Sequence, residues 1–162
     1  MSQRVPSPEP RRIEALVRAY LAADYGWRAG DAWSPLRIGT RATALEARFP
    51  QARCFAVITA WDPQSIPRAE ALNRAADAEL QAALRDAGVD IVPACSASPD
   101  GQWREPGWLV CDLPVEALDA LARRHGQLGT LCWPAGWAVR MRIGAICPPA
   151  LVGCPDIDWY RE

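Results

Sequence analysis

Two short polar segments of this chain hold the residue types that could bind or transform a ligand. The first, Thr59-Ala60-Trp61-Asp62-Pro63-Gln64-Ser65, closes the apolar run that begins at Cys54. The second is Asp100-Gly101-Gln102-Trp103-Arg104-Glu105. Open sheets often bind ligands at the carboxyl end of a central strand, and a helix N-terminus beside it attracts anions. We therefore expect any site to form where these segments meet.

Asp62 and Glu105 are the candidate catalytic residues, because two carboxylates can act as acid and base without His, Lys or a cofactor. Glu105 lies between Trp103 and Trp108, and large apolar rings can raise the pKa of a carboxyl group. The alternative is that Glu105 pairs with an arginine and is structural or holds a substrate cation. For Asp62 the alternative is turn chemistry, since Asp-Pro turns the chain without any ligand.

The candidate ligand-binding residues are Thr59, Trp61, Ser65, Asn73 and Trp103. The two tryptophans could stack a base or a sugar, although large aromatic side chains are more often part of a core. Asn73 lies off the alanine–leucine stripe of its predicted helix. Its side chain either bonds to the preceding turn or reaches a ligand.

Residue types that are missing exclude several classes of site. The chain has no lysine, which excludes a Walker-type phosphate loop and Schiff-base chemistry. Its one histidine, His125, excludes paired-histidine metal sites and is expected to end a helix. The six cysteines contain no Cys-x-x-Cys pair and are expected to fill the core. We predict no metal site and no cofactor.

Composition and charge are those of an ordinary globular protein of 162 residues, half of them hydrophobic. No apolar run approaches the ~20 residues of a membrane span, and the N-terminus lacks the apolar core of a signal peptide. We therefore expect a cytoplasmic protein with no membrane association. The net charge of −1 argues against broad nucleic-acid binding.

Hydrophobic periodicity and Gly or Pro breaks predict alternating helices and strands. The predicted helices are 8–25, 40–49, 67–87 and 114–125. The predicted strands are 36–39, 54–61, 89–95 and 108–111, followed by a hairpin of 129–133 and 137–143.

From residue 54 the element order is that of a split β-α-β sandwich. We therefore predict an α+β fold with a ferredoxin-like core and an N-terminal helix–strand–helix extension. Residues 1–7 are predicted to be a disordered lead-in. Residues 8–146 are predicted to form a single α+β domain, and residues 147–162 a C-terminal tail that wraps the surface.

The polar segments also resemble a known family. Phe55 to Pro63 with Ser65, then Asn73, Asp100-Gly101, Trp103, Glu105-Pro106 and Gly126-Gln127 are similar to a bacterial family catalogued only as domain of unknown function 3293. The resemblance covers about residues 15–142. It implies no reaction, because the function of the family is not established.

The chain departs from the family pattern at four positions. Asp62 stands where the family usually has Asn, Ala76 near a frequent Arg, Gly107 where Ser is common, and Leu128 where Asn is common. Each departure loses or changes a polar group, so a site formed by this set would be altered or weakened in this chain.

We expect a ligand-binding or regulatory module with a polar pocket at strand ends, because no nucleophile–base pair is visible. A small-molecule ligand is the expected partner, and the sequence names no protein partner. One alternative is a small carboxylate-dependent enzyme, a hydrolase or transferase acting on a nucleotide-like substrate. Another is a protein–protein interaction module whose eight tryptophans partly face a partner.

Overall fold

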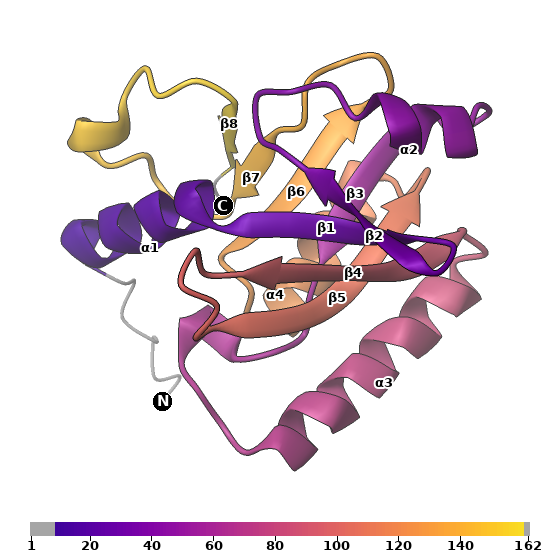
Figure 1. Cartoon of the computed structure of the whole chain (residues 1–162). Helices are drawn as coiled ribbons and strands as arrows, with labels where there is room; N and C mark the ends of the chain where they lie inside the picture. The colour runs from indigo at the N-terminus through magenta and orange to yellow at the C-terminus, as the bar shows by residue number, and fades with distance from the viewer. Residues whose placement is uncertain (1–8, 161–162) are drawn as a thin grey trace.

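The computed structural model describes residues 9–160, so the predicted lead-in of residues 1–7 lies outside the described part. Within it the fold is a mixed α+β arrangement of four helices and one eight-stranded sheet (Figure 1). The helices are α1 (Pro10–Ala22), α2 (Thr43–Arg48), α3 (Glu70–Asp86) and α4 (Val115–Arg124). The strands are β1 (Asp24–Ala29), β2 (Ala32–Leu36), β3 (Cys54–Ile58), β4 (Ile91–Ala97), β5 (Arg104–Cys111), β6 (Gly129–Pro134), β7 (Met141–Ile143) and β8 (Ile157–Trp159).

The sheet has the strand order β2-β1-β4-β5-β3-β6-β7-β8. All neighbouring strands are antiparallel except β7 and β8, which are parallel. Within this sheet, α3 connects β3 to β4 and α4 connects β5 to β6. As predicted, β3 is an inner strand with partners on both sides.

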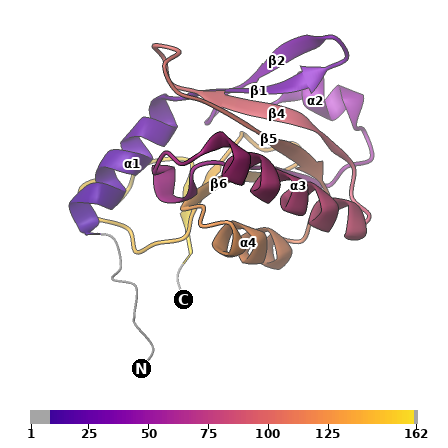
Figure 2. The ribbon, with the colours of Figure 1, turned by 90° about the horizontal axis from the view of Figure 1, so that it is seen from below.

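Two hydrophobic layers cover the two faces of the sheet. Strand β3 contributes to both, because successive side chains of a strand point to opposite faces. Ala56 and Ile58 pack with residues of α3 and α4, whereas Phe55 packs with residues of α1 and α2. Figure 2 shows α3 and α4 together on one face, with α1 at one end of the sheet.

The N-terminal extension differs from the prediction. The helix predicted to continue to residue 25 ends at Ala22, and the following residues form β1, which pairs with both β2 and β4. Gly26 permits this close pairing, because a Cβ there would lie 3.3 Å from the Ser34 carbonyl oxygen. The helix–strand–helix prediction is therefore wrong, and the extension is a helix, a hairpin and a helix.

Two further segments form strands where the sequence predicted irregular structure. The predicted surface tail contains β8, and its Leu151 and Ile157 are buried in the α1-side core. Strand β5 begins at Arg104, four residues earlier than predicted, so Glu105 lies on a strand and not in a loop. Glu105 pairs with Ser96 of the neighbouring strand β4.

Among the described residues, none of the helices combines the length and the apolar character needed to cross a membrane.

Candidate functional site

The turn after β3 is fixed first by Thr59. Its hydroxyl donates a hydrogen bond of 2.7 Å to the carbonyl oxygen of Pro106 and accepts one of 3.1 Å from the backbone N–H of Trp61. These bonds tie the turn to strand β5. The two polar segments predicted from the sequence therefore meet directly.

Asp62 and Asn73 hold each other in the same turn. The Asn73 side chain is 2 % exposed, and its Nδ2 donates to Asp62 Oδ1 at 2.8 Å while its Oδ1 accepts from the Asp62 N–H at 2.9 Å. Arg68 adds its Nε, 2.6 Å from Asn73 Oδ1, and its backbone N–H, 3.2 Å from Asp62 Oδ1. Asn73 therefore binds the turn, which was one of the two alternatives for it.

The end of α4 supports the turn from the other side. Gln127 Nε2 donates to the Trp61 carbonyl oxygen at 2.9 Å, and the Gln64 N–H donates to the Gly126 carbonyl oxygen at 2.8 Å. Asp62, Gln64 and Ser65 all have positive φ angles. Left-handed conformations cost of order 1 kcal/mol or more for residues with a Cβ, so surrounding contacts must hold this turn in place.

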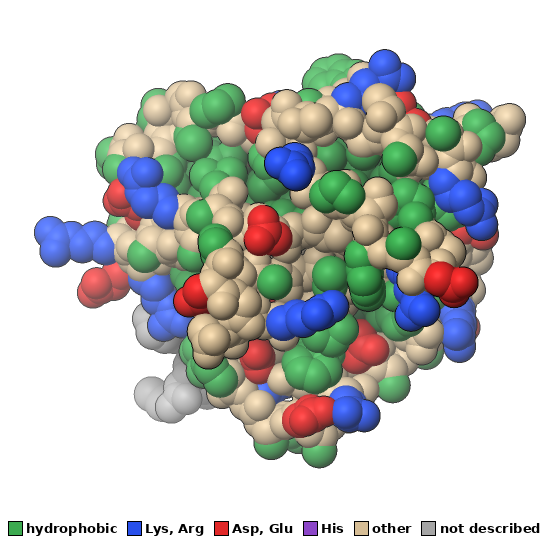
Figure 3. Space-filling view, in the orientation of Figure 1, with side chains coloured by type: hydrophobic (Ala, Val, Ile, Leu, Met, Phe, Trp, Pro, Cys, Tyr) green, Lys and Arg blue, Asp and Glu red, His purple; other side chains and the backbone are tan. Residues whose placement is uncertain are grey.

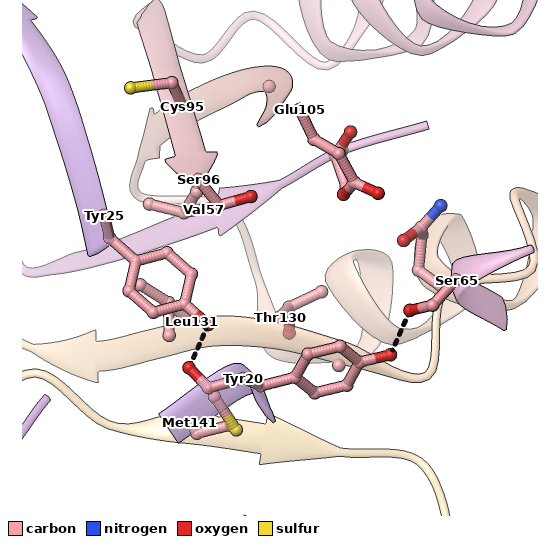
Figure 4. Close-up of a pocket in the computed structure, with 14 residues that line it drawn as sticks. Tyr20, Tyr25, Val57, Ser65, Cys95, Ser96, Glu105, Thr130, Leu131 and Met141 are labelled. Atoms are coloured by element: carbon pink, nitrogen blue, oxygen red, sulfur yellow. Dashed lines mark hydrogen bonds between the residues drawn. The ribbon is translucent and has the colours of Figure 1, made fainter. Parts of the chain in front are cut away.

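A cavity of about 70 Å³ lies beside this turn, on the face of the sheet that carries α1 (Figure 4). The strand register places Tyr25, Ser96 and Glu105 in one row across β1, β4 and β5, where they line the cavity. Thr59 and Ser65 line it from the turn, and the other lining residues are Tyr20, Val57, Cys95, Gly107, Gln127, Gly129, Thr130, Leu131 and Met141.

Glu105 is the only acidic residue among the lining residues of this cavity, which include no arginine or histidine. Burial raises its pKa to about 7, with a further upward effect from the charge of Asp62 and an opposing effect from the Trp103 hydrogen bond. Trp103 Nε1 donates to Glu105 Oε1 at 2.9 Å. Within residues 9–160 no arginine pairs with Glu105, so the alternative of an ion pair with arginine is not realised.

Two tyrosines line the same cavity as Glu105. The Tyr20 hydroxyl lies 2.8 Å from Ser65 Oγ, and the Tyr25 hydroxyl donates to the Tyr20 carbonyl oxygen at 2.6 Å. Burial is the main cause that raises the pKa of both phenols, and the charge of Glu105 raises them further. Gly129 makes room for the Tyr20 ring, because a Cβ there would lie 3.3 Å from Tyr20 Cδ2.

The predicted site residues divide into three groups. Thr59, Ser65 and Glu105 line the cavity. Asp62, Asn73 and Trp103 do not line it but bond to residues of the turn or to Glu105. Trp61 lines a separate groove with Trp33 and Trp108 on the other side of β5.

The sequence prediction missed Tyr20, Tyr25 and Ser96 as site residues. Tyr20 and Tyr25 were assigned to one amphipathic helix, and their apolar rings are typical of a core. Only the tertiary pairing of β1 with β4 brings Tyr25 next to Ser96. Gln127 carried a detectable signal, because it belongs to the Gly-Gln pair of the family pattern.

Charges outside the cavity are mixed. On the face shown in Figure 3, arginine and acidic side chains are interspersed with hydrophobic patches. Burial and the neighbouring Arg124 lower the pKa of His125, which ends α4 as expected but is buried as a neutral side chain. In the described residues no group of three or more His, Cys, Asp or Glu could hold a metal ion.

Fold and cavity together define an α+β protein with a small, mostly apolar cavity at the ends of its inner strands, into which Glu105 brings a carboxyl group. Residues 58–129 match a family described as "Protein of unknown function (DUF3293)", which confirms the resemblance predicted from the sequence. The matched segment contains Glu105 and the turn after β3, but not the two tyrosines. Neither the comparison with curated proteins nor that with solved structures gave a match.

Proposed function

We propose that this protein is a ligand-binding or regulatory module that holds a small polar molecule in the cavity beside Glu105. One observation carries this proposal: a largely buried carboxylate faces a cavity without a cationic partner among the described residues. Burial of a charge is costly unless it is paired. A bound ligand that pairs with the carboxylate would recover this energy.

The proposal includes a ferredoxin-like core. The inner strand order β4-β5-β3-β6 and the two helical connections, α3 and α4, support it. In this arrangement α1 and the β1–β2 hairpin are additions that close the cavity, with Tyr20 and Tyr25 as their contribution. The ligand site would then combine the core with its N-terminal extension.

The strained turn supports the same function. Its positive-φ residues are held by Asn73, Gln127 and Gly126, and strained backbone of this kind clusters at binding and active sites. Asp62 is proposed to act here as a positioning residue, because its Oδ1 already accepts two hydrogen bonds.

A thermal-shift screen against nucleotides, sugars, amino acids, amines and divalent ions tests the proposal, because a ligand of the folded state must raise the melting temperature. The variant is Glu105→Gln, and the matched control is Glu116→Gln, an exposed glutamate in the first turn of α4. We expect a shift that Glu105→Gln loses and Glu116→Gln keeps. A shift equal in all three proteins would place the ligand elsewhere.

A second candidate function is catalysis with Glu105 as the acid or base. The observation in its favour is the pKa of about 7, which keeps both protonation states populated near neutral pH. Any ligand found in the screen that contains a hydrolysable or transferable group is incubated with the protein. Turnover that is lost in Glu105→Gln, with binding retained, would support the enzyme; binding without turnover would support the module.

A further inference from the structure

The geometry points to the protonated amine of a small organic molecule as the ligand of this cavity. The inference rests on the proposed function, because it names the chemical class that the same cavity would take. It follows from the charge, the hydrogen-bonding groups, the aromatic rings and the size of the cavity.

The charge around the cavity is negative. Its lining contains one carboxylate and no arginine or histidine, and Asp62 lies close enough to raise the pKa of Glu105. Two arginines lie outside the lining: Arg12 acts on Tyr20 and donates to the Gln64 carbonyl oxygen, and Arg68 donates to Asn73 and to the Ala60 carbonyl oxygen. An anionic ligand would meet Glu105 without a compensating cation, whereas a cation would meet an unpaired carboxylate.

Several of the hydrogen-bonding groups that remain open can accept a hydrogen bond, including the buried Thr130 hydroxyl, which has no partner among the described residues and can also donate. Glu105 Oε1 accepts from Trp103, but Oε2 makes no hydrogen bond within residues 9–160. The Tyr20 and Ser65 hydroxyls share one hydrogen bond, so each has a lone pair left for a donor. An ammonium group has three donors and no acceptor, which fits this set.

The two tyrosine rings supply a second kind of attraction. Tyr20 and Tyr25 line the cavity on the side of α1 and β1 (Figure 4). The face of an aromatic ring attracts a cation, and the effect grows when the cation leaves water. A carboxylate and two aromatic rings in one lining therefore suit an ammonium group with a short alkyl chain.

The size of the cavity limits the buried group. A volume of about 70 Å³ corresponds to roughly five water-sized spheres at ~10–15 Å³ each. Such a space takes an aminoethyl or aminopropyl head group and not a nucleotide. A larger ligand would leave the rest of its structure outside the cavity.

The test is an NMR titration of the isotope-labelled protein with ethylammonium, ethanol and acetate at pH 6 and pH 8. The three probes have similar size and differ in charge, and the ionic strength is held constant so that screening does not change. We expect ethylammonium to shift the signals of the Tyr20, Ser65 and Glu105 region, with ethanol and acetate far weaker. The affinity should rise about tenfold from pH 6 to pH 8, because Glu105 loses its proton across that range.

The variants separate the possible failures. Glu105→Gln should lose at least about tenfold in ethylammonium affinity and all of its pH dependence, whereas Glu116→Gln should keep both. If acetate or ethanol binds at the cavity and ethylammonium does not, the amine inference is overturned and the binding function stands. If a broad screen finds no ligand whose binding requires Glu105, the amine inference and the proposed binding function are both overturned. Calcium chloride that shifts the same signals as strongly as ethylammonium would also contradict an organic amine.

Discussion

The ionised form of Glu105 destabilises the folded protein, because burial raises its pKa from 4.5 to about 7. Between these two pH values the folded state binds more protons than the unfolded state. The free energy of unfolding must therefore fall as the pH rises from 4.5 to 7 and then level off. A shift of this size corresponds to at most about 3 kcal/mol.

The first prediction concerns Glu105→Gln in the absence of ligand. The variant should be more stable than the parent at pH 8, by about 1–3 kcal/mol, and nearly equal to it at pH 5. Urea denaturation at both pH values measures the difference. The control, Glu116→Gln, should show no such pH dependence. A Glu105→Gln protein that is less stable at pH 8 would show that the ionised carboxylate is structurally required.

The second prediction concerns Asn73, the buried amide that holds the turn after β3. Asn73→Ala leaves the Asp62 N–H and the Arg68 Nε without their acceptor, so the free energy of unfolding should fall by about 2 kcal/mol. The neighbouring Arg74→Ala changes an exposed ion pair and should stay within about 0.5 kcal/mol. Comparable losses in the two variants, measured by urea denaturation, would contradict the role of Asn73.

At the scale of elements, the turn after β3 is locked by the end of α4. Gly126 has a φ of +64°, and a Cβ there would lie 2.8 Å from Pro63 Cβ. The turn can approach the helix end because this residue has no side chain. Gly107 plays a similar part between β5 and β3, since a Cβ there would lie 2.7 Å from the Ile58 carbonyl oxygen. A serine at this position would require β3 to shift.

The third prediction compares Gly126→Ala with Gly101→Ala. Gly101 also has a positive φ, +72°, but a Cβ there would meet nothing within 4 Å. Gly101→Ala should therefore cost about 1 kcal/mol from backbone strain alone, and Gly126→Ala at least about 1 kcal/mol more. Urea denaturation gives both values. Equal losses would mean that the contact with Pro63 is not tight.

The elements that could be predicted are those whose hydrophobic pattern extends over many residues. Helices α3 and α4 carry apolar stripes that end at a glycine, and β3 is a continuous apolar run between breakers. The first two residues of β1 were predicted as helix because Tyr25 continues the apolar spacing of α1. Strand β8 has three residues, too few to show a period.

The residues that line the cavity could likewise be predicted only in part. Thr59, Ser65 and Glu105, which line the cavity, were among the predicted candidates because polar residues next to strand ends are visible in the sequence. The wall made by Tyr20 and Tyr25 was not, since it depends on how distant segments pack. The pairing of Glu105 with Trp103 and not with an arginine depends on side-chain directions that no sequence pattern encodes.

At the scale of the whole molecule, Arg142 on β7 connects three parts of the chain. Its guanidinium donates to both carboxylate oxygens of Asp119 on α4, at 2.8 and 2.7 Å. Its Cζ lies 4.4 Å from the ring centroid of Tyr160, just beyond β8. These contacts join the helical layer on one face to the last strands of the sheet.

The fourth prediction tests this connection. Asp119 is 9 % exposed, so Asp119→Asn leaves the Arg142 charge poorly compensated in a largely buried position. The free energy of unfolding should fall by about 2–3 kcal/mol. Glu70→Gln, which removes the acid of the exposed pair with Arg74, should change it by no more than about 0.5 kcal/mol. If Asp119→Asn also lowered the free energy of unfolding by no more than about 0.5 kcal/mol, the buried pair would add no stability.

The two outermost strands of the sheet, β2 and β8, bear on how the protein behaves in concentrated solution. A long, flat edge strand offers unpaired N–H and C=O groups on which another molecule can grow a shared sheet. Strand β2 carries Pro35, which has no N–H to donate, and β8 is three residues long with Asp158 at its centre. Both edges therefore offer few unpaired backbone groups to which a strand of another molecule could add. Edge-to-edge aggregation and fibril growth are disfavoured for this reason.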